Sequence, residues 1–284
     1  MINRNQIINQ VKKCLIEAGS TFSADKKEAY TAAIERETDE RSKWILQTIL
    51  DNAIVAEKNK SPLCDDTGIP HILLEVGNNV LVSGDLIDAI NEGIAEGLKA
   101  LPGRPMGLGG DELQRIDQSG GISDRPEAVL PSPVLMRKSS DEKTKINILM
   151  FGGGPAIRAK TYRVFHKHKV ETVVEEIVAW ASESVAELGC TPCTLAIGIG
   201  RSHFEASSLM LEALVDGKYS EQTEIEKTIT DRVNSTNIGP LGIGGKTSVL
   251  GTFLKIGPQR ASGVRVVCLR PCCCFEPRIS SVEL

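Results

Sequence analysis

The sequence contains few aromatic and histidine side chains, no large excess of either charge, and no long hydrophobic run. Of its 284 residues, 41% are hydrophobic, 25% are charged and only 4% are aromatic, which is ordinary for a globular protein. No run approaches the ~18 apolar residues of a membrane span. The polar, amphipathic start also lacks the apolar segment of a signal peptide. We therefore expect a cytoplasmic protein that has no membrane partner.

The distribution of charge argues against another class of partner. Thirty-seven acidic and thirty-three basic residues give a net charge of −4, and Lys and Arg are scattered along the chain. Nucleic-acid-binding proteins usually carry a basic patch or stripe, so we expect no nucleic acid partner. The histidines are equally dispersed, and we expect them at the surface or in packing rather than in catalysis: His71, His166, His168 and His203.

Eight cysteines give the first indication of chemistry. Disulfides are disfavoured in the cytosol, so clustered cysteines there are more often metal ligands or redox groups. Cys14 and Cys268 fall inside apolar-periodic segments, and we expect them to be small buried hydrophobic residues. The other six occupy three segments, namely Cys64 alone, Cys190 with Cys193, and the run Cys272, Cys273 and Cys274.

The spacing of apolar residues predicts an α/β fold with a helical N-terminal part. Apolar residues recur at helical intervals within residues 1–60, and short apolar runs separated by amphipathic stretches follow. No linker poor in apolar residues divides the chain, so we expect one domain over residues 1–284 that includes the helical lead-in, residues 1–60. The later expected strands are 72–76, 146–151, 194–199, 248–256 and 264–269, and the expected helices are 86–98, 171–188, 205–214 and 224–233.

Two of the cysteine segments are placed on turns by their neighbours. Cys64 lies in residues 62–70 (PLCDDTGIP), where glycine and proline impose a turn and carboxylates stand beside the thiol. Such a turn can present a thiolate, and a buried structural turn is the alternative. Cys190 directly follows Gly189, where a helical run ends, so we expect it at a helix-to-strand junction.

The cysteine spacing argues against a zinc ribbon and suits an iron-sulfur cluster. A ribbon needs two CxxC pairs about 15–20 residues apart, and Cys193 and Cys272 are much farther apart than that. Distant cysteines, each on its own loop, suit a cluster assembled by tertiary folding. Three thiolates would leave one iron of a 4Fe-4S cluster open, and an open iron can act as a Lewis acid on a hydroxyl or carboxylate oxygen.

Two further segments have competing interpretations. Residues 244–247 (GGKT) are similar to the end of a phosphate-binding loop, but that motif requires glycine at the position of Pro240 and a preceding strand. We interpret these glycines instead as allowing close backbone approach to a cluster or a partner chain. The basic run 158–169 is interpreted as a solvated helix face, with a rim that attracts an anionic substrate as the alternative.

Several motifs, in their order along the chain, resemble class I (iron-sulfur) fumarate hydratases and L(+)-tartrate dehydratases. Residues 64–68 (CDDTG) resemble the Cys-Gln-Asp-Thr-Gly loop of that family, and residues 152–154 (GGG) resemble its substrate loop. Residues 237–247 (NIGPLGIGGKT) look like its long glycine-rich segment. Cys190 stands at the place of the second cluster cysteine, and Cys274, four residues before Arg278, matches the Cys-x-x-x-Arg ending.

The resemblance covers nearly the whole chain and implies a mixed α/β hydro-lyase domain. It implies a 4Fe-4S cluster held by Cys64, Cys190 and Cys274, with Cys272 as the second choice for the third ligand. It further implies reversible hydration of fumarate to L-malate, in which the open iron binds the hydroxyl and one carboxylate of the substrate.

The resemblance also implies roles for residues around the first cysteine. Asp66 matches an aspartate that assists proton transfer at the neighbouring carbon. Arg104 resembles an arginine that clamps a substrate carboxylate, and Gly153 or Gly154 would bring a backbone N–H to the substrate. Asp65 stands where the family commonly has a substrate-binding Gln, so a charge replaces a neutral donor. Where many members carry a His before the last cluster cysteine, this chain offers Gln259 and Arg260.

Single-chain members of this family have a further C-terminal domain that contributes the proposed general base and more carboxylate-binding residues. This chain ends ten residues after Cys274, so the resemblance implies a β subunit that carries that domain, in a hetero-oligomer of the α2β2 type. Tartrate and methylfumarate are alternative substrates. In a different class, a non-catalytic metal-binding or redox protein would use Cys190, Cys193 and the run 272–274.

Overall fold

The computed structural model describes residues 3–101, 103–104 and 106–284. Pro105, which follows Arg104 in the predicted carboxylate-binding motif, lies outside the described residues. The chain forms two compact units, each assembled from separate stretches: the first contains the described residues up to 22 with 53–153 and 278–284, and the second contains 23–52 and 154–277. The boundary crosses helix α3 (Glu40–Asn59) instead of following a linker.

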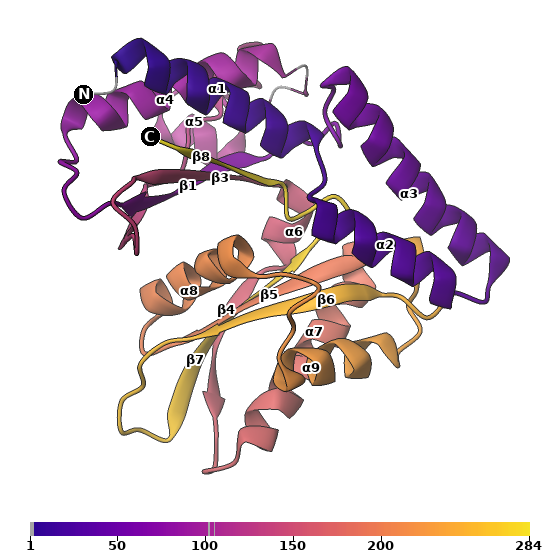
Figure 1. The fold of residues 1–284 in the computed structure, drawn as a ribbon. Coiled ribbons are helices and arrows are strands. Elements are labelled where there is room, and N and C mark those ends of the chain that lie inside the picture. Colours follow the sequence, from indigo (N-terminus) through magenta and orange to yellow (C-terminus); the bar gives the residue numbers. More distant parts are fainter. Residues whose placement is uncertain (1–2, 102, 105) are drawn as a thin grey trace. The chain divides into compact units, whose positions relative to one another are not determined.

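The first unit combines helices α1 (Arg4–Ser20) and α4 (Gly84–Ala100) with a four-stranded sheet of order β2-β1-β3-β8 (Figure 1). The central pair β1 and β3 is antiparallel, β2 is parallel to β1, and β8 is antiparallel to β3. The strands are β1 (Ile69–Val76), β2 (Leu135–Lys138), β3 (Lys145–Phe151) and β8 (Ile279–Glu283), and the short helices are α5 (Glu112–Asp117) and η1 (Pro126–Ala128).

The core of the first unit lies between the two helices and the sheet. Helix α4 begins at Ser83, whose hydroxyl accepts the N–H of Leu86, a capping bond that supplies one of the missing partners at a helix start. Its Gly93 lets α1 approach closely, because a Cβ there would lie 2.7 Å from Cβ of Val11. Fully buried apolar residues fill this core, including Val11, Leu15, Ile72, Leu74, Ile90, Ile94, Ile146 and Ile148.

The second unit is a sheet of order β4-β7-β5-β6 with helices on both faces. Helix α8 packs on one face, and α7 and α9 pack on the other (Figure 1). Strands β5 and β6 are parallel, whereas β7 is antiparallel to both β4 and β5. The bounds are β4 (Lys160–Phe165), β5 (Cys193–Gly200), β6 (Val249–Ile256), β7 (Val264–Cys272), α2 (Ala24–Arg36), α6 (Gly153–Arg158), α7 (Val170–Leu188), α8 (His203–Asp216), α9 (Glu224–Asn234) and η2 (Pro240–Gly242).

Strand β5 is the centre of the second unit. All eight of its residues are buried, as expected of a strand that is covered on both faces. Gly198 allows α8 to lie directly on this strand, since a Cβ at that position would collide with the carbonyl oxygen of Ala206. The core of this unit is formed by residues of α7, α9, β5, β6 and β7, including Ile177, Val185, Leu195, Ile197, Ile229, Val249 and Leu269.

The predicted α/β fold with a helical N-terminal part is confirmed. Helices α1, α2 and α3 cover most of residues 4–59, and every strand and helix expected beyond residue 60 is present within a few residues of its expected bounds. The helical lead-in is divided between the units, since α1 belongs to the first and α2 to the second. That residues 1–284 act as one domain stays a prediction. No described helix is long and apolar enough to span a membrane.

The interpretation of the basic run 158–169 as a solvated helix face is wrong for most of its length. Residues 160–165 form β4, which pairs with β7 and is the edge strand of this sheet. Edge strands commonly carry Lys and Arg because charge opposes pairing with another chain. Val164 is buried, and Tyr162 packs edge-on against Trp180 of α7. Tyr162 and Val164 alternate along the strand with the exposed Arg163 between them, which the basic composition of the run conceals.

Candidate functional site

The carboxylate of Asp66 lies where the turn before β1 meets the turn after β3. These strands pair at Ile69 and Phe151, so their adjoining turns are neighbours. The Asp66 Oδ2 atom accepts the N–H of Gly153 at 2.8 Å, and Oδ1 accepts the N–H of Gly68 at 3.1 Å. Two backbone donors therefore fix the orientation of this carboxylate.

Arg104 is held beside the same turn by backbone contacts. Its N–H donates to the carbonyl oxygen of Asp65 at 3.1 Å, and its own carbonyl accepts the hydroxyl of Thr67 at 2.7 Å. The guanidinium Nη1 lies 3.5 Å from Oδ2 of Asp65, with the two side chains 58% and 76% exposed. The ion pair is accessible to solvent and weak. Arg104 can therefore exchange this carboxylate for that of a ligand.

Four of the predicted substrate-site residues are thus brought together in the first unit, namely Asp65, Asp66, Arg104 and Gly153. The N–H of Gly153 is directed at Asp66. Gly154, the next residue along α6, belongs to the second unit, and a Cβ there would meet no atom within 4 Å. Their substrate-binding roles stay predictions.

Arg278 stabilises this turn through a hydrogen bond to its backbone, a role that the motif spacing alone does not indicate. Its side chain is 2% exposed, and Nη1 donates to the backbone oxygen of Asp66 at 2.7 Å. Gly68 has a φ of 79°, and a Cβ there would collide with the Arg278 guanidinium. Glycine at this position therefore serves both the left-handed turn and the close approach of the arginine.

In the second unit, Cys190 and Cys274 are hydrogen-bonded neighbours. Cys190 lies between α7 and β5, as predicted, and Cys274 lies two residues beyond the end of β7. Because β5 and β7 pair side by side, with Thr194 opposite Cys272, these two ends meet. The N–H of Cys274 donates to the carbonyl oxygen of Cys190 at 2.8 Å. Two of the three predicted ligands are therefore adjacent.

Their thiols differ in environment. Cys190 is exposed, whereas Cys274 is 3% exposed. A hydrogen bond with the Cys273 thiol, burial, and the nearby thiols of Cys273 and Cys190 raise the pKa of Cys274 well above its ordinary value. Several thiols therefore crowd one place, where a metal that displaces their protons would relieve the mutual repulsion of the thiolates.

The remaining cysteines are more deeply enclosed. Cys193 and Cys272 lie within strands at 0% exposure, and burial raises the pKa of both thiols. Cys14 and Cys268 are buried, as expected for small hydrophobic residues. The buried position of Cys193 disfavours the alternative in which it forms an accessible redox pair with Cys190.

Cys64 is half-buried in the first unit, and its thiol donates to Asp65 Oδ1 at 3.7 Å. Because Cys190 and Cys274 belong to the second unit, the set of three cluster ligands stays a prediction. Within the described parts of each unit, no group of three or more His, Cys, Asp or Glu side chains is placed to hold a metal ion.

Two side chains of α2 contact the third cysteine segment. Nζ of Lys26 donates to the carbonyl oxygen of Glu276 at 2.7 Å, and the Tyr30 hydroxyl donates to that of Cys274 at 2.8 Å. Burial lowers the pKa of Lys26 to about 8, against the opposing effect of the nearby cysteines and Glu276. Glu276 also accepts two bonds from Arg270, at 3.1 and 3.0 Å.

The glycine-rich segment 237–247 passes next to Cys190. The hydroxyl of Thr191 donates to the carbonyl oxygen of Gly239 at 2.6 Å. Gly239 lies so close to Gly244 that a Cβ on Gly239 would collide with the carbonyl oxygen of Gly244. The segment leads into strand β6, not into a helix, which agrees with the rejection of a phosphate-binding loop. Close backbone approach occurs within the segment itself, and an approach to a cluster or partner stays a prediction.

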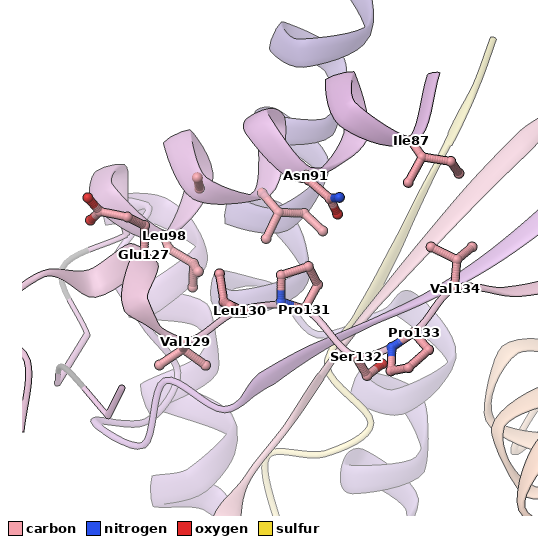
Figure 2. A pocket seen from close by; sticks show the side chains of 12 residues that line it. Ile87, Asn91, Leu98, Glu127, Val129, Leu130, Pro131, Ser132, Pro133 and Val134 are labelled. Atoms are coloured by element: carbon pink, nitrogen blue, oxygen red, sulfur yellow. The ribbon is translucent and has the colours of Figure 1, made fainter. Parts of the chain in front are cut away.

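The first unit also contains a cavity of about 430 Å³, whose lining differs in chemistry from the residues described above (Figure 2). It is lined by one side of α4 and by residues 129–134, and most of the lining side chains are apolar (Figure 2). None of the predicted ligand or substrate residues belongs to its lining. Its chemistry does not suit a dicarboxylate, which requires cationic or N–H donors.

Comparison with known proteins identifies the family. Residues 8–282 match the family model described as fumarate hydratase (Fumerase). A Methanocaldococcus jannaschii protein named "Putative L(+)-tartrate dehydratase subunit alpha" is 27% identical over 277 residues, covering 93% of this chain and 94% of that protein. The L(+)-tartrate dehydratase subunit alpha of Escherichia coli K12 is 22% identical over 281 residues, covering 95% and 90%. The chain therefore belongs to the fumarate hydratase (Fumerase) family of hydro-lyases.

Proposed function

We propose that this chain is the α subunit of a hydro-lyase that acts on a four-carbon dicarboxylate, with the reversible hydration of fumarate to L-malate as its reaction. The observation that carries the proposal is the meeting of Asp65, Asp66, Arg104 and Gly153 at one end of the β1–β3 pair. A fixed carboxylate beside an accessible guanidinium is the combination that proton transfer on a dicarboxylate requires.

The proposed cofactor is a 4Fe-4S cluster held by Cys64, Cys190 and Cys274. Two observations favour this fit: the hydrogen bond that places Cys274 against Cys190, and the buried cation of Lys26 on the Cys274 segment. When bound, such a cluster supplies an open iron as Lewis acid for a hydroxyl or carboxylate oxygen. A cluster held by cysteine thiolates suits a reducing compartment, so the proposed location is the cytoplasm.

The protein groups have separate tasks in this proposal. Arg104 binds one substrate carboxylate through its planar fork, leaving its weak pairing with Asp65. Asp66, already fixed by two N–H donors, assists proton transfer at the carbon next to the one that carries the hydroxyl. Gly154, with open space around it, offers backbone to the substrate. Arg278 keeps the turn, and so the Asp66 carboxylate, in place.

A β subunit is proposed as the partner, in an α2β2 assembly. The relatives in Methanocaldococcus jannaschii and Escherichia coli are both named as alpha subunits, which supports a second chain here. That chain would contribute the general base and further carboxylate-binding groups. Arg104 is the cation among the four clustered residues, and a dicarboxylate has two charged ends to be bound.

L(+)-tartrate is the second candidate substrate, and one observation besides the names of the relatives favours it. Asp65 places an exposed carboxylate where the resembling family commonly has Gln. An ionised carboxylate accepts hydrogen bonds and donates none. Tartrate has two hydroxyl groups, whereas malate has one and fumarate has none. Asp65 would accept a hydrogen bond from the second hydroxyl of tartrate.

The test is anaerobic co-expression with the β partner, followed by assays of fumarate, L-malate and L-tartrate turnover. The purified complex should be brown with broad visible absorbance, and Cys64→Ser should lose iron and activity together because one of three ligands is gone. Cys268→Ser, a buried cysteine outside the proposed set, is the matched control and should keep both. A colourless, zinc-containing wild type, or full iron and activity in Cys64→Ser, would contradict the proposal.

A further inference from the structure

We propose that Lys26 and Tyr30 form a supporting face for the cluster, in which Tyr30 positions Cys274 and Lys26 supplies a buried positive charge to the metal-bound thiolates. This inference rests on the proposed function, because it assigns these residues to the same cluster. It concerns positioning and charge, and neither residue is proposed to touch the substrate.

The two side chains lie on one face of α2. Residues four apart are neighbours on a helix surface, and both side chains are buried, with Lys26 1% and Tyr30 0% exposed. They donate to successive parts of one segment, Tyr30 to the carbonyl of Cys274 and Lys26 to that of Glu276. This face of α2 is therefore dedicated to the cysteine segment.

The peptide groups on either side of Cys274 are fixed from two directions. Its N–H donates to Cys190 at 2.8 Å, and its carbonyl accepts the Tyr30 hydroxyl at 2.8 Å. A ligand whose backbone is held on both sides keeps its sulfur in place without the metal. Such preorganisation lowers the entropy that is lost when the cluster binds.

The burial of Lys26 requires compensation by negative charge. An ammonium removed from water is costly unless an anion faces it. Glu276 is near, and its carboxylate also accepts two bonds from the guanidinium of Arg270. Cys272, Cys273 and Cys274 also lie near enough to Lys26 to interact with it electrostatically. Because Nζ of Lys26 is buried on the cysteine segment, negative charge on metal-bound thiolates there would compensate it.

Metal binding is the condition that makes these thiols anionic at neutral pH. A cuboidal 4Fe-4S cluster with three thiolates carries net negative charge, and a buried cation nearby favours both the thiolate form and the more reduced state of the cluster. Lys26 is thus a charge complement to the loaded site. Removing its charge should loosen the cluster and make it harder to reduce.

The experiment uses the intact complex with the β subunit, purified anaerobically. Lys26→Gln removes the charge and keeps an N–H donor, and Tyr30→Phe removes only the hydroxyl. Lys27→Met, on the adjacent position of α2, is the matched control. The readouts are the rate at which a ferrous chelator removes iron and the midpoint potential of the cluster, followed by visible absorbance and electron paramagnetic resonance.

Lys26→Gln should lose iron about 10- to 100-fold faster, the usual cost of changing a residue that supports a metal ligand, and its midpoint potential should fall. Tyr30→Phe should also lose iron faster, with a smaller change in potential, because the charge remains. Lys27→Met should behave like the wild type. This pattern separates an effect of charge from a merely structural effect. If Lys26 had only a structural role, its replacement would not change the midpoint potential more than Tyr30→Phe does.

Wild-type iron retention and potential in Lys26→Gln would overturn the role of Lys26. If circular dichroism shows that this variant does not fold, Tyr30→Phe decides alone, and wild-type iron retention in it would overturn the supporting face. A wild-type complex that contains no cluster is a different result, since it rejects the proposed function itself.

Discussion

Replacing Asp65 with Asn tests the electrostatics of the predicted carboxylate site. The change removes a negative charge 3.5 Å from the guanidinium of Arg104 and keeps the side-chain length. If Arg104 must leave Asp65 to bind substrate, the variant has a free fork ready for the dicarboxylate. We therefore expect a lower KM for fumarate and L-malate with kcat little changed, because the interaction is released equally for substrate and transition state.

The magnitude follows from the exposure of the pair. With side chains 76% and 58% exposed, Asp65 and Arg104 form a surface ion pair. Such pairs are worth about 0.2–1 kcal/mol, which corresponds to a KM lower by about 1.5- to 5-fold. Loss of the repulsion between Asp65 and the substrate carboxylates acts in the same direction. The effect should shrink at high ionic strength, where the screening length falls from about 10 Å at 0.1 M to about 3 Å at 1 M.

The assay compares the wild type, Asp65→Asn and the charge-retaining control Asp65→Glu at low and high salt, with each substrate in turn. A KM for fumarate that rises in Asp65→Asn would refute the competition between Asp65 and substrate for Arg104. L-tartrate provides a second comparison. If Asp65 accepts the additional hydroxyl of tartrate, the same variant should raise the KM for tartrate while lowering that for fumarate.

Three further predictions concern stability. Arg278→Met should lower the free energy of unfolding by about 1.5–3 kcal/mol in urea titrations, because a buried charged donor to Asp66 is lost; the exposed Arg163→Met should stay within about 0.5 kcal/mol of wild type. Glu276→Gln should cost about 3–5 kcal/mol, because it leaves the buried Arg270 uncompensated; an unchanged melting temperature would contradict this. Burial raises the pKa of Cys14 from 9.0 to about 11, so the folded state binds more protons than the unfolded state between these values. The Cys14 contribution to stability is thus complete below pH 9 and lost by about pH 11, and the difference in unfolding free energy between wild type and Cys14→Ala should shrink by about 2–3 kcal/mol over that range.

The fold was predictable wherever one periodicity dominated. The helical spacing of α7 and the continuous apolar run of β5 identified both elements within a residue or two. Strand β4 was missed because Lys, Arg and Phe occupy its exposed positions at the sheet edge. Strands β2 and β8 are short and only partly buried, so their sequences contain too few apolar positions to show an alternation.

The division into two units could not be seen in the sequence for a related reason. In a sequence, a domain boundary is ordinarily marked by a linker, which is a stretch that makes few contacts. Here the chain passes between the units at four points, one of them inside α3 and another between Pro277 and Arg278, just before β8. Each unit collects stretches that are distant along the chain. Composition therefore changes nowhere in the way that a domain linker would require.

Some residues of the candidate site can be recognised from short sequence motifs, and others can be recognised only from their contacts in the folded chain. Asp66 and Cys274 could be proposed because turns rich in glycine, proline and thiols are unusual enough to recognise by their order. Lys26 and Tyr30 had no such signal, since a lysine and a tyrosine on an amphipathic helix are ordinarily exposed or half-exposed. Only the burial of an ammonium against the cysteine segment distinguishes Lys26 from its neighbour Lys27. A site whose reactive groups lie on loops depends on such buried partners to hold those loops, and the partners carry no motif because their role is set by what they contact.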